Sequence, residues 1–112
     1  MLHRLTSMLG VHRALAGNLD GDGDLDIVAA SLLPATTRNE SNHGQLDSLI
    51  WLEQHQPGQF LRHFLETGNC IHAAIDLADF DNDGDLDIAT GWFMDRAAAT
   101  ENAVTIWWNE SR

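Results

Sequence analysis

The stretch that decides the fold reads DFDNDGDLD, residues 79–87, and a second copy, NLDGDGDLD, occupies residues 18–26. In both copies acidic side chains alternate with small or apolar residues, and a glycine stands at the same place, Gly23 or Gly84. Alternating carboxylates in a tight turn converge on one point, and glycine permits the sharp bend that the turn requires. The two stretches therefore predict two loops that can each hold a hard cation on oxygen ligands.

Both loops lie in a longer repeat, in which residue 26 corresponds to residue 87 with an offset of 61 positions. Matching segments outside the loops are 2–5 with 62–65, 12–14 with 72–74, 25–29 with 86–90, and 49–53 with 105–110. This alignment pairs Trp51 with Trp107 and, with one residue of slippage, His12 with His72. A period of about 60 residues fits one four-stranded blade of a β-propeller and is too long for most helical repeats.

Short segments rich in β-branched and aromatic residues, separated by Gly, Asn, Asp and Pro, predict strands throughout the chain. The expected strands are 11–17, 24–31, 48–53 and 59–66 in the first unit, and 72–78, 86–93 and 103–109 in the second. Polar loops are expected at 34–47 and 94–102, and no segment has sustained helical periodicity. The predicted fold is all-β, a β-propeller unit of four-stranded antiparallel blades within a single domain, residues 1–112.

In this prediction blade one covers about residues 11–66, and blade two covers about residues 72–109. Blade two lacks a fourth strand, whereas residues 1–6 resemble the fourth strand of blade one. We therefore expect the N-terminal strand to complete blade two, either in its own chain or in a neighbouring one.

Two blades cannot close a ring and would expose sheet faces and strand edges. One solution is strand exchange in a homo-oligomer, a trimer or tetramer that gives six or eight blades. The other is that the remaining blades of a parent protein complete the ring.

The charge is concentrated in the two loops. Seventeen acidic residues stand against six arginines, and the formal net charge is −11. Nine of the twelve aspartates lie in the two loops, so the acidity predicts a bound cation rather than a generally solvated surface. The scattered arginines argue against a nucleic-acid partner. The apolar runs are too short for a membrane span.

Two further features restrict the setting of the protein. Cys70 is the only cysteine, which excludes an intrachain disulfide. Residues 14–16, Ala-Leu-Ala, resemble a signal-peptidase site, but Arg4, His12 and Arg13 leave no apolar segment before it. No signal peptide is therefore expected, and this segment is predicted to be a strand.

Each loop is expected to bind one Ca²⁺ ion, which takes six to eight oxygen ligands. The expected ligands are Asp79, Asp81, Asp83, the backbone carbonyl of Asp85, and Asp87 in loop two, and Asn18, Asp20, Asp22, the carbonyl of Asp24, and Asp26 in loop one. Because Asn18 replaces a carboxylate by an amide, we predict that site one binds calcium more weakly than site two.

An EF-hand begins with a similar pattern, but its loop has a glutamate at position 12 and continues as a helix. Counted from Asn18 and Asp79, position 12 is Ala29 and Thr90, and β-branched residues follow both loops. The sequence therefore excludes an EF-hand.

The loop pattern, followed later by Ile-Trp and an amide residue, resembles the FG-GAP/VCBS repeat family, the repeat of integrin α-subunit propellers and of many bacterial surface proteins. The resemblance implies four-stranded blades with calcium between strands one and two. It also implies an extracellular or periplasmic setting, where calcium is abundant. The chain departs from the family pattern at Asn18 and in lacking Phe-Gly before either loop.

The function predicted from these features is that of a calcium-stabilised scaffold and protein-interaction module, not an enzyme, because the chain has no nucleophile motif and no phosphate-binding loop. Trp92, Phe93 and Trp108 lack aromatic counterparts in the first unit, so carbohydrate binding by a lectin-like propeller is the alternative. A fragment of a larger propeller enzyme is a further alternative.

Overall fold

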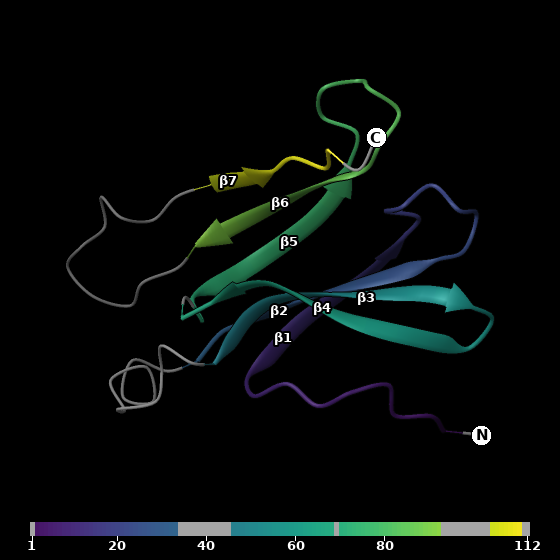
Figure 1. Cartoon of the computed structure of the whole chain (residues 1–112). Coiled ribbons are helices and arrows are strands. Elements are labelled where there is room, and N and C mark those ends of the chain that lie inside the picture. Colours follow the sequence, from purple (N-terminus) through teal and green to yellow (C-terminus); the bar gives the residue numbers. More distant parts are fainter. Residues whose placement is uncertain (1, 34–45, 69, 93–103, 111–112) are drawn as a thin grey trace.

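The computed structural model describes residues 2–33, 46–68, 70–92 and 104–110, and within them the regular elements are β-strands. The strands form two antiparallel sheets (Figure 1). Sheet one contains, in spatial order, β1 (Val11–Gly17), β2 (Asp26–Ser31), β3 (Asp47–Gln56) and β4 (Gln59–Thr67), and sheet two contains β5 (His72–Ala78), β6 (Asp87–Trp92) and β7 (Val104–Trp107). No helix among the described residues is long and apolar enough to cross a membrane.

All seven expected strands are present, and β1 and β5 have the predicted bounds. β2 and β6 begin one or two residues later than expected, because Asp24, Leu25 and Leu86 still belong to the acidic loops. β3 extends farther than expected, into a tight hairpin in which Gly58 takes a positive φ of 78°. Phe93, like most of the predicted polar loops, lies outside the described residues.

The N-terminal segment, residues 2–8, forms no strand in the single chain. It runs along sheet one, where the Arg62 Nη1 donates to Thr6 Oγ1 at 2.6 Å and to the Ser7 carbonyl at 2.7 Å. The expected completion of blade two by this segment is therefore not formed within the chain. Its exchange into another chain stays a prediction.

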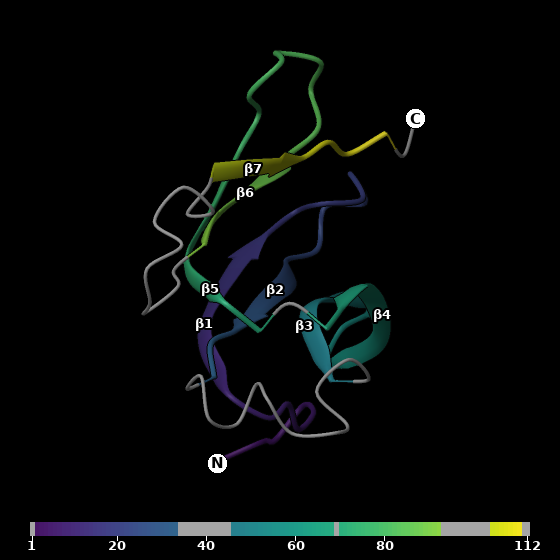
Figure 2. The same ribbon diagram turned by 90° about the vertical axis from the view of Figure 1, so that its left-hand side faces the viewer.

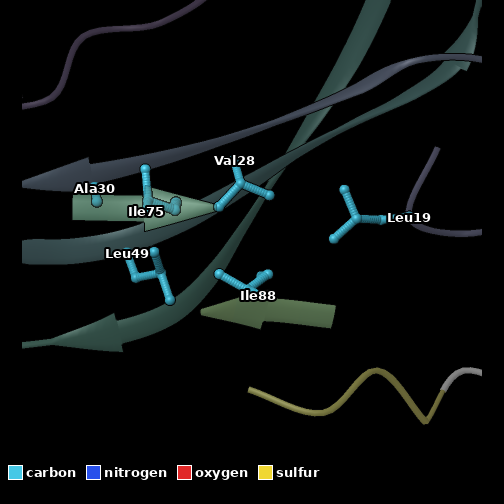
Figure 3. Close-up of a cluster of buried hydrophobic side chains, with 6 residues drawn as sticks. All are labelled: Leu19, Val28, Ala30, Leu49, Ile75 and Ile88. Atoms are coloured by element: carbon cyan, nitrogen blue, oxygen red, sulfur yellow. The ribbon is translucent and has the colours of Figure 1, made fainter. Parts of the chain in front are cut away.

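The two sheets pack against each other through one hydrophobic cluster, with β1 beside β5 (Figure 2). Figure 3 shows its six buried members, which come from both sheets and from loop one: Leu19, Val28, Ala30, Leu49, Ile75 and Ile88. Burial of each large aliphatic side chain contributes about 1.5–3 kcal/mol. This cluster fixes how the two acidic loops sit relative to each other.

The hydrogen-bond register confirms the offset of 61 residues in the first two strands of each sheet. Ile27 lies opposite Ala16, and Ile88 lies opposite Leu77. Both sheets even have a register shift at the same place, just after Val11 and just after His72.

Two pairings expected from the sequence are wrong by one residue. Val11 pairs with Ser31 as His72 pairs with Trp92, so His72 corresponds to Val11 and not to His12. The two histidines are identical in type but occupy neighbouring, not equivalent, positions of the repeat.

In the third strands, Ile27 pairs with Leu52 and Ile88 pairs with Trp107, so Trp107 corresponds to Leu52 and not to Trp51. A shift of one residue moves a side chain to the other face of a sheet. Trp51 and Trp107 therefore approach the same cluster from opposite sheets.

Candidate metal centres

The two acidic loops connect the first and second strands of their sheets and are visible in Figure 1 as the β1–β2 and β5–β6 connections. Each loop passes twice through positive φ, at Gly21 (77°) and Gly23 (92°) in loop one, and at Asn82 (62°) and Gly84 (93°) in loop two. Glycine takes this conformation without steric cost, and asparagine tolerates it better than most residues. The sequence thus builds the same bend twice.

The bend brings carboxylates together. In loop two, Asp79, Asp81, Asp83 and Asp87 each offer an oxygen that lies within 4.8 Å of the others. In loop one, Asp20, Asp22 and Asp26 meet the same condition. The donors are hard oxygen atoms with several negative charges, which is the donor set that Ca²⁺ prefers. Without a cation these carboxylates repel one another.

The last aspartate of each loop is fully buried and ties the loop to itself. The Leu19 N–H donates to Asp26 Oδ2 at 3.1 Å, and the Phe80 N–H donates to Asp87 Oδ2 at 3.1 Å. An ionised group is rarely buried without partners. Here backbone N–H groups near the start of each loop are partners of the buried carboxylate, and these hydrogen bonds close the loop.

The second oxygen of each buried aspartate binds the end of the third strand. The Gln54 N–H donates to Asp26 Oδ1 at 2.9 Å, and the Asn109 N–H donates to Asp87 Oδ1 at 2.8 Å. The Asn109 side chain also donates from Nδ2 to the Leu19 carbonyl at 2.5 Å, so it joins loop one to sheet two. These amide residues were not predicted to take part in the site, although an amide at the end of each third strand was a visible signal.

Asp24 and Asp85 make the same backbone hydrogen bond in the two loops. Asp24 and Asp85 are not among the converging carboxylates, and their backbone N–H groups donate to the preceding aspartates, Asp22 and Asp83, at 2.9 Å. Their carboxylates are therefore not part of the converging groups, and their backbone carbonyls stay predicted ligands.

The first ligand position differs between the two loops. Asn18 Oδ1 accepts one bond, from the Gly21 N–H at 3.1 Å. Asp79 accepts two, from the Asp83 N–H at 3.1 Å and the Gly84 N–H at 2.8 Å.

The carboxyl groups perturb one another. Burial and contact with the Asp22 carboxyl raise the pKa of Asp20 from 3.8 to about 6, and contact with Glu53 adds to the rise. Burial and the neighbouring Asp83 carboxyl likewise raise the pKa of Asp81. Burial works to raise the pKa of Asp79 too, but the N–H groups of Gly84 and Asp83 stabilise its anion and hold the pKa below its ordinary value.

The predicted aromatic site is not a single platform. Trp108 lines a cavity of about 220 Å³ between the sheets, together with Leu19, Trp51, Leu65, Ile88, Trp107, Asn109 and Glu110. Trp92 instead packs edge-on against His72, with ring centroids 6.4 Å apart. Trp107, which precedes Trp108, pairs with Ile88, and Ile88 lies four residues before Trp92 on β6. Trp108 and Trp92 therefore lie toward opposite ends of this strand pair, with backbones roughly 13 Å or more apart.

Comparison with protein families gives one match, to the FG-GAP-like repeat, over residues 18–90. The matched region contains both acidic loops and most of both sheets. No curated protein and no solved structure matches the chain.

Proposed function

Because the chain belongs to the FG-GAP-like repeat family, we propose that it is a calcium-stabilised β-propeller unit that serves as a structural scaffold and protein-interaction module. The observation that carries the proposal is the convergence of carboxylates at the same corner of both sheets. Calcium bound there would neutralise the converging charges and hold the turn between the first two strands. Asp20, Asp22 and Asp26 would bind one ion, and the four converging aspartates of loop two, Asp79, Asp81, Asp83 and Asp87, would bind the other.

Packing between the sheets supports a propeller. Sheet two contacts sheet one through Ile75, Leu77, Ile88 and Trp107. Their register equivalents in sheet one are Ala14, Ala16, Ile27 and Leu52. Ile27 and Leu52 belong to a second apolar cluster on the face of sheet one that is turned away from sheet two, which we call the open face of sheet one. The open face of sheet one therefore corresponds to the face of sheet two that packs against sheet one. A preceding blade could pack on this open face in the same way.

The opposite end of the unit has the matching surface. Val104 and Ile106 are the register equivalents of Leu49 and Trp51, which pack into the contact between the sheets. Val104 is 81% exposed and Ile106 is 37% exposed, so this face of sheet two is open. A head-to-tail contact would cover both open faces, as in a closed ring of three or four chains or in a longer chain with further blades.

The N-terminal segment bears on this assembly. It lies over the open face of sheet one, where Leu5, Thr6 and Met8 enclose a cavity of about 230 Å³ with residues of β1, β2 and β3. In the proposed assembly this segment would leave the open face and pair with the free edge of β7 in a neighbouring chain. This move would expose the open face of sheet one and add a fourth strand to sheet two of the neighbouring chain.

A second candidate function, carbohydrate binding, is favoured by the cavity that Trp51, Trp107 and Trp108 line. Aromatic rings beside polar groups suit the apolar face and the hydroxyls of a sugar. A glycan array probed in millimolar Ca²⁺ tests this function, and we expect any binding to be lost in Trp108→Ala. Absence of binding to every glycan on the array would contradict it.

The proposed setting is extracellular or periplasmic, since loops of this kind fill at the millimolar calcium found there. We further propose a non-enzymatic role, because the sequence shows no nucleophile motif and the proposed calcium sites would use its clustered acids.

Thermal unfolding with and without calcium tests the main proposal. Calcium at a hundredfold excess over its Kd stabilises by about 2.7 kcal/mol per site. For a domain of this size that is a rise in Tm of about 10 °C or more. Removal of calcium with EDTA should reverse the rise, and a Tm that is the same in EDTA and in 2 mM Ca²⁺ would show that the loops have no such role. Mg²⁺ at the same concentration is the control for general charge screening.

A further inference from the structure

Loop one has one carboxylate fewer than loop two, because Asn18 stands where loop two has Asp79. We propose that Glu53 of β3 supplies loop one with this missing carboxylate and is a ligand of its calcium ion. The proposal rests on the calcium role proposed above, and it adds a residue from outside the loop to the site.

The end of β3 lies directly against loop one. The Gln54 N–H donates to Asp26 Oδ1 at 2.9 Å, and the Gln54 side chain donates from Nε2 to the Leu25 carbonyl at 2.7 Å. These two bonds fix the strand to the loop on the C-terminal side of Glu53. The Glu53 side chain lies close enough to Asp20 to raise the pKa of that carboxyl, although it lies outside the group of three carboxylates that converge in loop one.

A second contact orients Glu53. His63 of β4 lies with Nε2 at 2.8 Å from Glu53 Oε1, and the His63 ring stacks on Trp51 with centroids 4.6 Å apart. A carboxylate can accept several bonds, so the bond to His63 leaves acceptor sites on Glu53 for a cation. His63 is therefore a positioning residue in this arrangement.

An ion pair with His63 alone would not explain why Glu53 also contacts another acid. Two carboxylates in contact repel each other unless a proton or a cation lies between them. Loop two needs no such addition, since it already has four converging carboxylates, and the register places Trp108 at the position that corresponds to Glu53. With Glu53 each site has four carboxylates, so we expect the two sites to bind calcium with similar affinity.

The test is calcium titration by isothermal calorimetry with site two silenced by Asp81→Ala and Asp83→Ala. In this background Glu53→Gln should weaken calcium binding at site one by about tenfold or more, the size of effect usual for a group at a metal site. Asp76→Asn removes one negative charge from β5, outside both groups of converging carboxylates, and should leave the affinity unchanged within about twofold. Asn18→Asp added to Glu53→Gln should restore the affinity, because the carboxylate returns within the loop.

Equal affinities for Glu53→Gln and its parent would overturn the proposal, as would an equal loss in Asp76→Asn, which would indicate a long-range effect of net charge. Should Glu53→Gln fail to fold by circular dichroism, Glu53→Asp replaces it. This variant keeps the charge, shortens the reach by one methylene and should show a smaller loss, whereas an unchanged affinity would contradict direct ligation. A wild-type chain that binds no calcium would overturn the calcium role itself. If wild type binds calcium at both sites and substitution of Glu53 changes neither affinity, only the inference about Glu53 is overturned.

Discussion

Asp26 and Asp87 differ from the other acids of their loops because they are buried and each accepts two backbone N–H groups. Each joins its own loop to the end of the third strand in the same sheet. The exposed aspartates Asp22, Asp81 and Asp83 have no such structural role. At the residue scale, the last acid of each loop fixes the loop to its sheet and also converges with the more exposed acids on the site proposed for the cation.

Asp20 gives a prediction about pH. Its pKa is raised from 3.8 to about 6 without calcium, so the folded state binds a proton more tightly than the unfolded state does. The contribution of such a group to stability is present below about pH 4 and is lost as the pH rises through about 6. In EDTA, Asp20→Asn should therefore destabilise less at pH 7 than at pH 4.5, relative to wild type, as measured by urea unfolding at both values.

Calcium should reverse this dependence, because the ion and the proton compete for the Asp20 carboxylate. With 2 mM Ca²⁺, wild type should lose calcium-dependent stability as the pH falls below about 6. If Asp20→Asn and wild type show the same pH dependence in EDTA, the raised pKa is not a property of the folded chain.

At the element scale, Gly17 marks the place where the end of β1 meets sheet two. A Cβ atom there would lie 2.9 Å from Leu86 Cδ1 and 3.0 Å from Leu77 Cδ1. Gly91, a half-buried residue of β6, would place its Cβ 3.6 Å from the nearest atom, the Ala74 Cβ of its own sheet. The two glycines are thus a matched pair for testing the contact between the sheets.

Gly17→Ala should lower the free energy of unfolding by about 1 kcal/mol, because the two leucine side chains must move to admit a methyl group. Gly91→Ala should be neutral or slightly stabilising, since alanine restricts the unfolded chain. Chemical denaturation of both variants measures the difference. An equal effect of the two substitutions would indicate that the sheets do not pack as described.

Strand positions were predictable because the alternation of apolar and polar residues is local. The order β1 to β4 and the bounds of β1 and β5 follow from that alternation and from the glycine-rich turns. The pairing of third strands was not predictable. Trp51 and Trp107 look equivalent in sequence, but the loops that precede their strands differ in length, and only the hydrogen-bond register shows the shift of one residue.

At the scale of the whole molecule, the two open faces are the main feature. The open face of sheet one carries Ala14, an exposed residue whose register equivalent in sheet two is Ile75, which is buried between the sheets. In a head-to-tail assembly Ala14 would therefore be buried against the next chain. In a single chain it faces solvent and the N-terminal segment.

This difference gives a prediction about mass in solution. Wild type should sediment as a single species of three or four chains of 12.4 kDa, and Ala14→Arg should sediment as a single chain, because a buried unpaired charge is costly at an interface. His55→Arg, at the exposed end of β3, is the control and should leave the assembly intact. A wild-type chain that sediments at 12.4 kDa would contradict self-assembly and favour pairing with blades of another chain.

The sequence by itself determined the two acidic loops, their spacing of 61 residues, the all-β fold and the family, because each depends on residues close together in the chain. Only the tertiary structure decided which side chains outside the loops reach them. Gln54 and Asn109 bind the buried aspartates, and Glu53 meets Asp20, because sheet formation brings the end of a third strand beside a loop far away in sequence. The expectation of a weaker first site came from the loop alone, whereas the fold also brings Glu53 beside Asp20, from a strand that begins more than twenty residues after the loop.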